Sequence, residues 1–166
     1  MAGPGTASLY QGGTADTGTS GPSRLAGWWA TIKPDGRPLL NSVGALWAGG
    51  AIWFTTGQQS QKARNLKLNP RCTIAMSAED FDVAIKGRVE RVMDPDLVAP
   101  RAKEWAAGGW PCEVDESGIA LTAPYSAPSA GPPPWFVYRV TPLKATAIST
   151  VEEGGATTWT FEEPVG

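Results

Sequence analysis

Residues 55–66 carry hydroxyl, amide and basic side chains in an order that suits a phosphate site. Their sequence is Thr-Thr-Gly-Gln-Gln-Ser-Gln-Lys-Ala-Arg-Asn-Leu. Thr55 and Thr56 end a predicted strand, Ser60 is the expected N-cap of a helix, and Lys62 falls in that helix's first turn. The free N–H groups and the dipole of a helix start attract anions, so the segment predicts a phosphate-binding loop.

The position of Lys62 strengthens this interpretation. A lysine in the first turn opposes the helix dipole, which favours negative side chains there. A cation where an anion is preferred indicates that the anion is supplied by a ligand. The alternative is a solvated helix face that carries Lys62, Arg64 and Lys67 without a binding role.

The chemistry of the remaining side chains is restricted. The chain has no histidine, which excludes Ser-His-Asp and Cys-His catalysis and histidine-ligated metal or haem sites. Cys72 and Cys112 have no metal-ligand spacing and fit small buried thiols. No carboxylate pair stands out as an acid–base dyad, so no catalytic residue is assigned. Tyr125 and Tyr138 are candidate proton donors.

Composition limits the partners and the compartment. The chain has 166 residues and a formal net charge of -2, which favours neither nucleic acid nor an anionic membrane as a partner. Residues 1–23 are rich in Gly, Ala, Ser and Thr and are predicted to form a flexible arm, whereas residues 24–166 form one domain. The arm does not resemble a signal peptide, and no apolar run is long enough for a membrane helix, so a cytoplasmic location is expected.

The order of elements predicts a mainly β protein. Strands are expected at about residues 25–33, 38–47, 51–55, 71–77, 81–93, 135–148 and 157–161, with Leu40, Val43 and Leu46 as core candidates of the second. Helices are expected within 58–69 and 94–107, the latter with Asp94 as N-cap and Pro95 in its first turn. Two close hairpins without βαβ alternation indicate an antiparallel barrel with peripheral helices.

Two features remain outside this regular pattern. Residues 108–134 are predicted to be a long Pro-rich loop that borders a functional cleft, and Pro142 is predicted to mark an edge or a bulge in its strand. Among the eight tryptophans, those at 105, 110 and 135 flank the loop and are candidates to wall a substrate pocket. Those at 28, 29, 47 and 53 fit a core or a dimer interface.

Several segments together resemble the pyridoxamine 5′-phosphate oxidase-like family. They are Lys-Pro-Asp-Gly-Arg-Pro at 33–38, Gly-Ala-Ile-Trp-Phe-Thr-Thr at 50–56, Ser-Gln-Lys-Ala-Arg-Asn-Leu at 60–66, Asn-Pro-Arg at 69–71 and Val-Tyr-Arg-Val-Thr-Pro at 137–142. The resemblance covers about residues 25–161. It implies a split β-barrel with a few peripheral helices, a homodimer, and FMN or the deazaflavin F420 as cofactor, bound in clefts between protomers.

The resemblance also implies roles for particular residues. Ser60 and Lys62 would hold the cofactor phosphate, and Thr55 and Thr56 would line the ribityl or phosphate path. The other positions that it assigns to cofactor binding are Asn41, Ser42 and Val43 beside the ring, Arg64 and Asn65 on the helix, and Lys86 and Trp159 from the partner chain. Many relatives have an arginine immediately before the tryptophan of the last strand, where this chain has Thr158.

These observations predict an oxidoreductase that transfers a hydride between F420 or FMN and a small planar organic substrate. Oxidation of pyridoxamine phosphate itself is not expected, because that enzyme's C-terminal Arg/His substrate signature is missing. Extra basic residues on the 60–66 helix favour F420 slightly, since they would suit an acidic tail. The alternatives are a flavin-binding or storage protein without turnover, and a structural dimer whose site has decayed.

Overall fold

The computed structural model describes residues 23–77, 80–151 and 155–162. The predicted arm at 1–23 lies almost wholly outside the described residues. The described part contains nine strands, two α-helices and one 3₁₀ turn. Among these residues, no helix is both long and apolar enough to span a membrane, and no group of three or more Cys, Asp or Glu side chains is placed to hold a metal ion.

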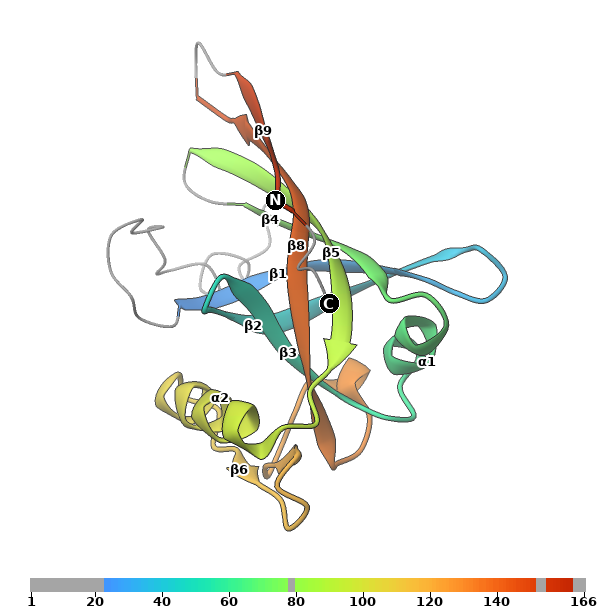
Figure 1. Cartoon of the computed structure of the whole chain (residues 1–166), viewed down its shortest axis with the longest axis vertical. Helices are drawn as coiled ribbons and strands as arrows, with labels where there is room; N and C mark the ends of the chain where they lie inside the picture. The colour runs from blue at the N-terminus through green and yellow to red at the C-terminus, as the bar shows by residue number, and fades with distance from the viewer. Residues whose placement is uncertain (1–22, 78–79, 152–154, 163–166) are drawn as a thin grey trace, which may run out of the picture.

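Six antiparallel strands close into a barrel (Figure 1), which confirms the predicted fold class. The strand order is β3–β2–β1–β4–β5–β8, and β8 pairs with β3 again to close the ring. The barrel strands are β1 (Ser23–Ile32), β2 (Pro38–Ala48), β3 (Ala51–Gly57), β4 (Arg71–Ser77), β5 (Phe81–Arg91) and β8 (Trp135–Ser149). Closure leaves less strand edge exposed than an open sheet of this size would present.

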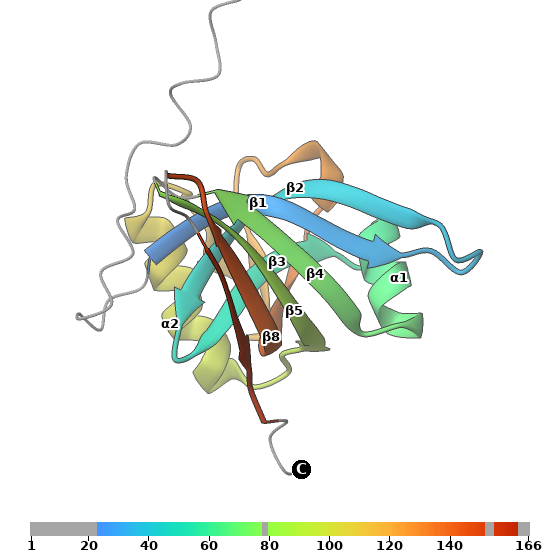
Figure 2. The ribbon, with the colours of Figure 1, turned by 90° about the horizontal axis from the view of Figure 1, so that it is seen from above.

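Two helices lie on different sides of this barrel (Figure 2). Helix α1 (Gln61–Leu68) begins after Ser60, whose side chain accepts a hydrogen bond from the backbone N–H of Ala63. Helix α2 (Pro95–Ala107) begins after Asp94, whose side chain accepts from the N–H of Asp96. Both predicted N-caps are confirmed, because short polar side chains satisfy N–H groups that a helix start leaves free.

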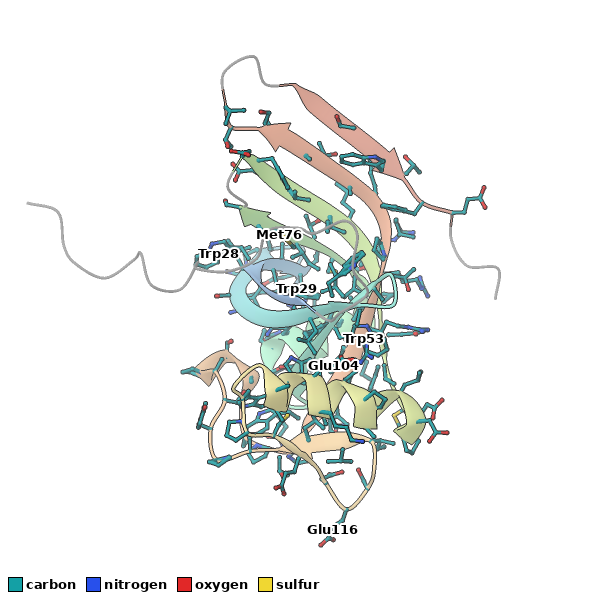
Figure 3. All side chains as sticks on the ribbon, turned by 90° about the vertical axis from the view of Figure 1, so that its left-hand side faces the viewer. Trp28, Trp29, Trp53, Met76, Glu104 and Glu116 are labelled. Atoms are coloured by element: carbon teal, nitrogen blue, oxygen red, sulfur yellow. The ribbon has the colours of Figure 1, made fainter. Side chains whose placement is uncertain are left out.

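The apolar residues form two cores. The first fills the barrel and includes Trp29, Phe54 and Tyr138, whose rings pack in sequence with centroids 4.2 and 5.1 Å apart. The second lies outside the barrel, where Trp53 and its neighbours meet α2. Figure 3 shows Trp53 close to Glu104, which belongs to that helix, whereas Trp28 and Met76 lie away from it.

The prediction that Leu40 is a core residue is wrong, since its side chain is 57% exposed. Val43 and Leu46 are buried as predicted. Side chains alternate between the two faces of a strand, and the inward set of β2 here contains Val43 and Ala45, which puts Leu40 outside. Leu46 is buried because it packs into the second core, on the outer face of the barrel.

The segment at 108–134 is more regular than predicted. It contains the short strands β6 (Glu113–Val114) and β7 (Ala120–Thr122), and the 3₁₀ turn η1 (Pro128–Ala130). Strand β7 pairs with β8 at Leu121↔Trp135, where β5 has already ended. The exposed β-edge of β8 explains why these residues form strands that local sequence did not indicate.

Pro142 occupies a bulge in β8, as predicted. Gly87 lies opposite Pro142 and Lys86 lies opposite Lys144, so Leu143 is an extra residue in the ladder. Pairing with β3 ends at Val140, and pairing with β9 (Ala156–Thr160) begins at Lys144. A residue without an N–H group is tolerated where the ladder is interrupted.

Gly57, at the end of β3, packs closely against the backbone at the end of η1. A Cβ atom at this position would lie 2.7 Å from the carbonyl oxygens of both Ala130 and Pro132. Gly57→Ala is therefore expected to lower the free energy of unfolding by about 1–3 kcal/mol, as overpacking against backbone does. Urea unfolding measures the change. Gly44→Ala, where a Cβ would meet nothing within 4 Å, is the control, and an equal loss in both variants would contradict the steric explanation.

Candidate functional site

The barrel is split between β2 and β3. The two strands pair only over Leu46↔Trp53, Trp47↔Ile52 and Ala48↔Ala51. Before Leu46, the edge of β2 that faces β3 pairs with no other strand in the described part of the chain, although its opposite edge pairs with β1 as far as Pro38. Backbone N–H and C=O groups on such a free edge need other partners.

A cavity of about 240 Å³ lies at this split. Strand β2 forms one wall, β3 and α1 contribute Thr55 and Lys62, and the end of α2 with the loop after β7 closes the other side. The lining residues are Ser42, Val43, Gly44, Ala45, Leu46, Thr55, Lys62, Trp105, Gly108, Gly109, Trp110, Tyr125, Ser126, Ala127, Ser129 and Ala130.

Among the described residues that line this cavity, Lys62 is the only one with a charged side chain. It is 3% exposed, and its ammonium group lies 5.9 Å from the centroid of the Phe54 ring. None of the ion pairs found among the described residues involves it. Loss of hydration lowers the pKa of Lys62 from 10.5 to about 8. A buried cation without a counter-ion is costly, so the site is suited to an anion.

The start of α1 adds backbone donors beside Lys62. The Ser60 hydroxyl accepts from Ala63 and also forms a 2.8 Å hydrogen bond with Thr56. The N–H groups of Gln61 and Lys62 have no acceptor among the residues that the structure describes. Two free N–H groups and one ammonium group are donors of the kind that a phosphate binds.

The sequence-predicted site residues on β2, β3 and α1 divide into three groups. Ser42, Val43, Thr55 and Lys62 line the cavity. Thr56, Ser60 and Asn65 are buried behind its wall, where Asn65 donates a 3.0 Å hydrogen bond to Thr31. Asn41 and Arg64 do not line the cavity, and the Arg64 guanidinium instead bonds Gln59 and Gln61 on the surface.

Lys86 on β5 and Trp159 on β9 are not among the residues that line the cavity. In the cross-strand rows, Lys86 lies opposite Lys144, and Trp159 lies opposite Ala145. Lys144 and Ala145 are consecutive and therefore point to opposite faces of β8. Lys86 and Trp159 are both exposed and occupy opposite faces of the sheet. Their predicted contact with a cofactor of the partner chain stays a prediction.

Two tryptophans line the same cavity as Lys62. Trp105 and Trp110 meet edge to face with centroids 6.2 Å apart, and the Trp110 indole N–H donates a 2.7 Å hydrogen bond to the carbonyl of Tyr125. The Tyr125 hydroxyl in turn donates a 3.4 Å hydrogen bond to the carbonyl oxygen of Gly109. These contacts hold the loop against the end of α2. Residues 108–134 border this cavity, as predicted. Of the three tryptophans predicted to wall a pocket, Trp105 and Trp110 line the cavity and Trp135 does not.

Sequence reasoning missed the small residues of this wall. Ser126, Ser129 and Ala130 line the cavity, and their only sequence signal is the Pro-rich loop in which they lie. Tyr138, one of the two candidate proton donors, is buried in the barrel, which raises the pKa of its hydroxyl. Tyr125 lines the cavity and is 58% exposed.

Both cysteines are buried and free. Burial raises the pKa of Cys72 to about 12 and also raises that of Cys112. A thiol with a raised pKa is a poor nucleophile at neutral pH, because the thiolate is the reactive form. The structural interpretation of these cysteines is confirmed.

A closed six-stranded barrel, split beside a buried lysine and a helix start, defines the split β-barrel class of ligand-binding proteins. The chain belongs to the pyridoxamine 5′-phosphate oxidase family, whose model matches residues 22–141. This match confirms the resemblance inferred from the sequence motifs. A search of curated proteins found no match.

Solved structures share the fold at low sequence identity. PhzG from Burkholderia lata 383, in complex with tetrahydrophenazine-1-carboxylic acid, is 17% identical, with a TM-score of 0.56 over 82% of this chain and 76% of that one. A heme binding protein from Mycobacterium smegmatis is 22% identical, with a TM-score of 0.55 over 80% and 52%. A pyridoxamine 5′-phosphate oxidase-related, FMN binding protein from Nostoc punctiforme PCC 73102 is 16% identical, with a TM-score of 0.53 over 83% and 88%.

Proposed function

We propose that this protein is a flavin- or deazaflavin-dependent oxidoreductase that transfers a hydride between FMN or F420 and a small planar organic substrate. The observation that carries the proposal is the buried ammonium group of Lys62 in the cavity lining, which has no ion-pair partner among the described residues. Family membership supports a cofactor of this type, and one of the structural neighbours is described as FMN binding.

The residues present fit such a cofactor. Lys62 and the N–H groups of Gln61 and Lys62 would hold its phosphate. The free edge of β2 offers backbone N–H and C=O groups along one side of the cavity, which suits the polar edge of a flat heterocycle. When bound, the cofactor would supply the hydride chemistry, and the protein's part would be to bind and orient it.

The other wall suits a planar, uncharged substrate. Trp105 and Trp110 present aromatic surface, and the described residues of the lining other than Lys62 are uncharged. Flat rings stack well on such surfaces. The Tyr125 hydroxyl lies in the cavity lining and would serve as a proton donor, with solvent as the alternative source.

A non-catalytic binding or storage protein is the second candidate. The observation in its favour is that the lining contains no carboxylate, histidine or thiol that would serve as an acid or base. Hydride transfer does not need such a group, so turnover must distinguish the two candidates. The predicted cytoplasmic location is independent of this choice and stays a prediction.

The test begins with the absorbance spectrum of the purified protein and titration of the apoprotein with FMN and with F420. We expect one of them to bind, and the bound, reduced cofactor to be reoxidised by a quinone, enone or nitro acceptor at least about tenfold faster than the free reduced cofactor. Stopped-flow absorbance measures this rate, with the free cofactor as control. Binding without faster turnover would support the storage protein, and binding of neither cofactor would refute both candidates.

A further inference from the structure

Lys62 combines deep burial with access to an open cavity. Its side chain is 3% exposed and lines the cavity of about 240 Å³. None of the ion pairs in the described part of the chain includes it, and the described lining contains no acidic side chain. A small molecule in the cavity can therefore reach this amine without displacing a carboxylate of the described residues.

The surroundings of this amine favour its uncharged form. The nitrogen lies 5.9 Å from the centroid of the Phe54 ring, and Tyr125 is the one other titratable side chain in the described lining. Loss of hydration lowers the pKa of Lys62 from 10.5 to about 8. At pH 8 about half of the amine is then uncharged, compared with about 0.3% for a lysine of ordinary pKa. The uncharged amine is the form of lysine that attacks carbonyl groups.

The same cavity has room and apolar walls for a flat ring. Trp105 and Trp110 contribute aromatic surface. Val43, Ala45 and Leu46 contribute aliphatic surface. An apolar cavity of about 150 Å³ is large enough to bind benzene, so a volume of about 240 Å³ admits one aromatic ring with a short substituent.

We propose that Lys62 is a covalent site for small aromatic aldehydes when no cofactor is bound, and that it holds them as imines. The nitrogen of the uncharged amine attacks the carbonyl carbon, and a C–N bond forms. The nitrogen then gives up two protons, the carbonyl oxygen takes up two and leaves as water, and a C=N bond remains. Nothing is oxidised or reduced, so the step needs no further reactant, and water reverses it.

The exposed lysines of the described chain lack this combination of features. Lys67, Lys86, Lys103 and Lys144 are exposed and do not line the cavity. An imine formed at such a position stays in contact with bulk water, which returns it to the aldehyde. An imine at Lys62 is instead enclosed by the apolar walls of the cavity, which favours its persistence.

Imine formation and cofactor binding exclude each other. The proposed phosphate contact uses the charged ammonium group of Lys62, whereas the imine uses the same nitrogen and fills the same cavity. An aldehyde would therefore block cofactor loading, and a bound cofactor would protect the lysine. The inference goes beyond the proposed function, because it needs only the cofactor-free protein and the aldehyde.

Reductive trapping tests the site in the full-length, cofactor-free protein. The protein is incubated with salicylaldehyde at pH 8, borohydride converts any imine to a stable secondary amine, and mass spectrometry of the protein and its peptides locates the label. We expect the label at Lys62 to form about 10- to 100-fold faster than at Lys67, because the larger share of uncharged amine is offset only in part by its lower basicity.

Two variants check the assignment. Lys62→Arg keeps a cation in the cavity but cannot form an imine, so it should lose the label, whereas Lys67→Met should keep it. Circular dichroism checks that both are folded, and peptide mapping of the wild type decides the question if Lys62→Arg does not fold. Labels spread evenly over the exposed lysines, or an unlabelled Lys62, would overturn the proposal.

A cofactor arm separates this inference from the proposed function. FMN or F420, whichever binds, should slow the labelling of Lys62 by about tenfold when present at about ten times its Kd. Labelling of Lys62 in a protein that binds neither cofactor would support the aldehyde site while it refutes the proposed function. Labelling that continues at full rate beside a bound cofactor would contradict the exclusion and place the cofactor phosphate elsewhere.

Discussion

Lys62→Met is expected to weaken cofactor binding by about 10- to 100-fold. The side chain is almost fully buried, lines the cavity and has no ion-pair partner among the described residues. A charge-assisted hydrogen bond contributes about 1.5–3 kcal/mol, and each 1.4 kcal/mol is about a factor of ten in affinity. Methionine keeps the length and apolar character of the stem, so the change isolates the charge. Fluorescence titration with FMN and with F420 measures the effect.

Lys67→Met is the matched control for this result. Lys67 lies on the same helix but is exposed and does not line the cavity. Its loss should change the affinity by less than about twofold, as expected for a solvated charge. If Lys62→Met binds the cofactor like the wild type while it remains folded, the phosphate site is elsewhere and the proposed function loses its main support.

The same substitution should have the opposite effect on the apoprotein, which it is expected to stabilise at pH 7. Burial lowers the pKa of Lys62 from 10.5 to about 8, so at pH 7 the folded apoprotein carries a desolvated charge. One pKa unit corresponds to about 1.4 kcal/mol, which puts the gain from removing this charge at up to about 3 kcal/mol. Urea unfolding of the cofactor-free protein measures the gain.

The pH dependence has a defined sign. Between about pH 8 and 10.5 the unfolded chain binds more protons at Lys62 than the folded chain does, so the stability of the wild-type apoprotein rises with pH in this window. The advantage of Lys62→Met should therefore be full below about pH 8 and vanish as the pH approaches 10.5. An advantage that does not change between pH 7 and 10 would contradict the assignment, and Lys67→Met should show no such trend.

Opposite effects of one substitution on binding and on stability would identify Lys62 as a residue kept for its ligand. Core lysines are rare because their burial costs free energy. A buried lysine of this kind lowers the stability of the free protein, and binding of an anion offsets this loss.

Much of the local structure could be read from particular residues. Ser60 and Asp94 mark the two helix starts because their side chains bond N–H groups within three residues along the chain. The turn at Pro34–Arg37 forms as expected, with Gly36 at a φ of 83° that favours glycine. The strand at Arg71–Ser77 begins and ends where the sequence predicts. The two helix starts and the turn depend on contacts between near neighbours in sequence, whereas the strand also pairs with β1, more than forty residues earlier in the chain.

Predictions that depend on which elements pack against one another were less accurate. The sequence of β2 contains apolar residues on both faces. The sequence alone does not show which face points into the barrel, and Leu40 was therefore assigned to the core although it lies on the outer face. Strands β6 and β7 form because β8 extends beyond the end of β5 and leaves an edge to pair with. Neither the inward face of β2 nor the unpaired edge of β8 can be inferred from a short window of sequence.

The sequence by itself determined the class of fold, the helix start at Ser60 and the candidate phosphate lysine, because hydrophobic alternation, capping and turn residues act locally. Only the tertiary structure decided where that lysine points. The barrel closes through β3 and β8, which are about eighty residues apart in the chain, and β2 leaves β3 after three paired positions. That separation brings Lys62, Thr55, Trp110 and Tyr125 around one cavity, an arrangement that follows from long-range packing and not from local propensity.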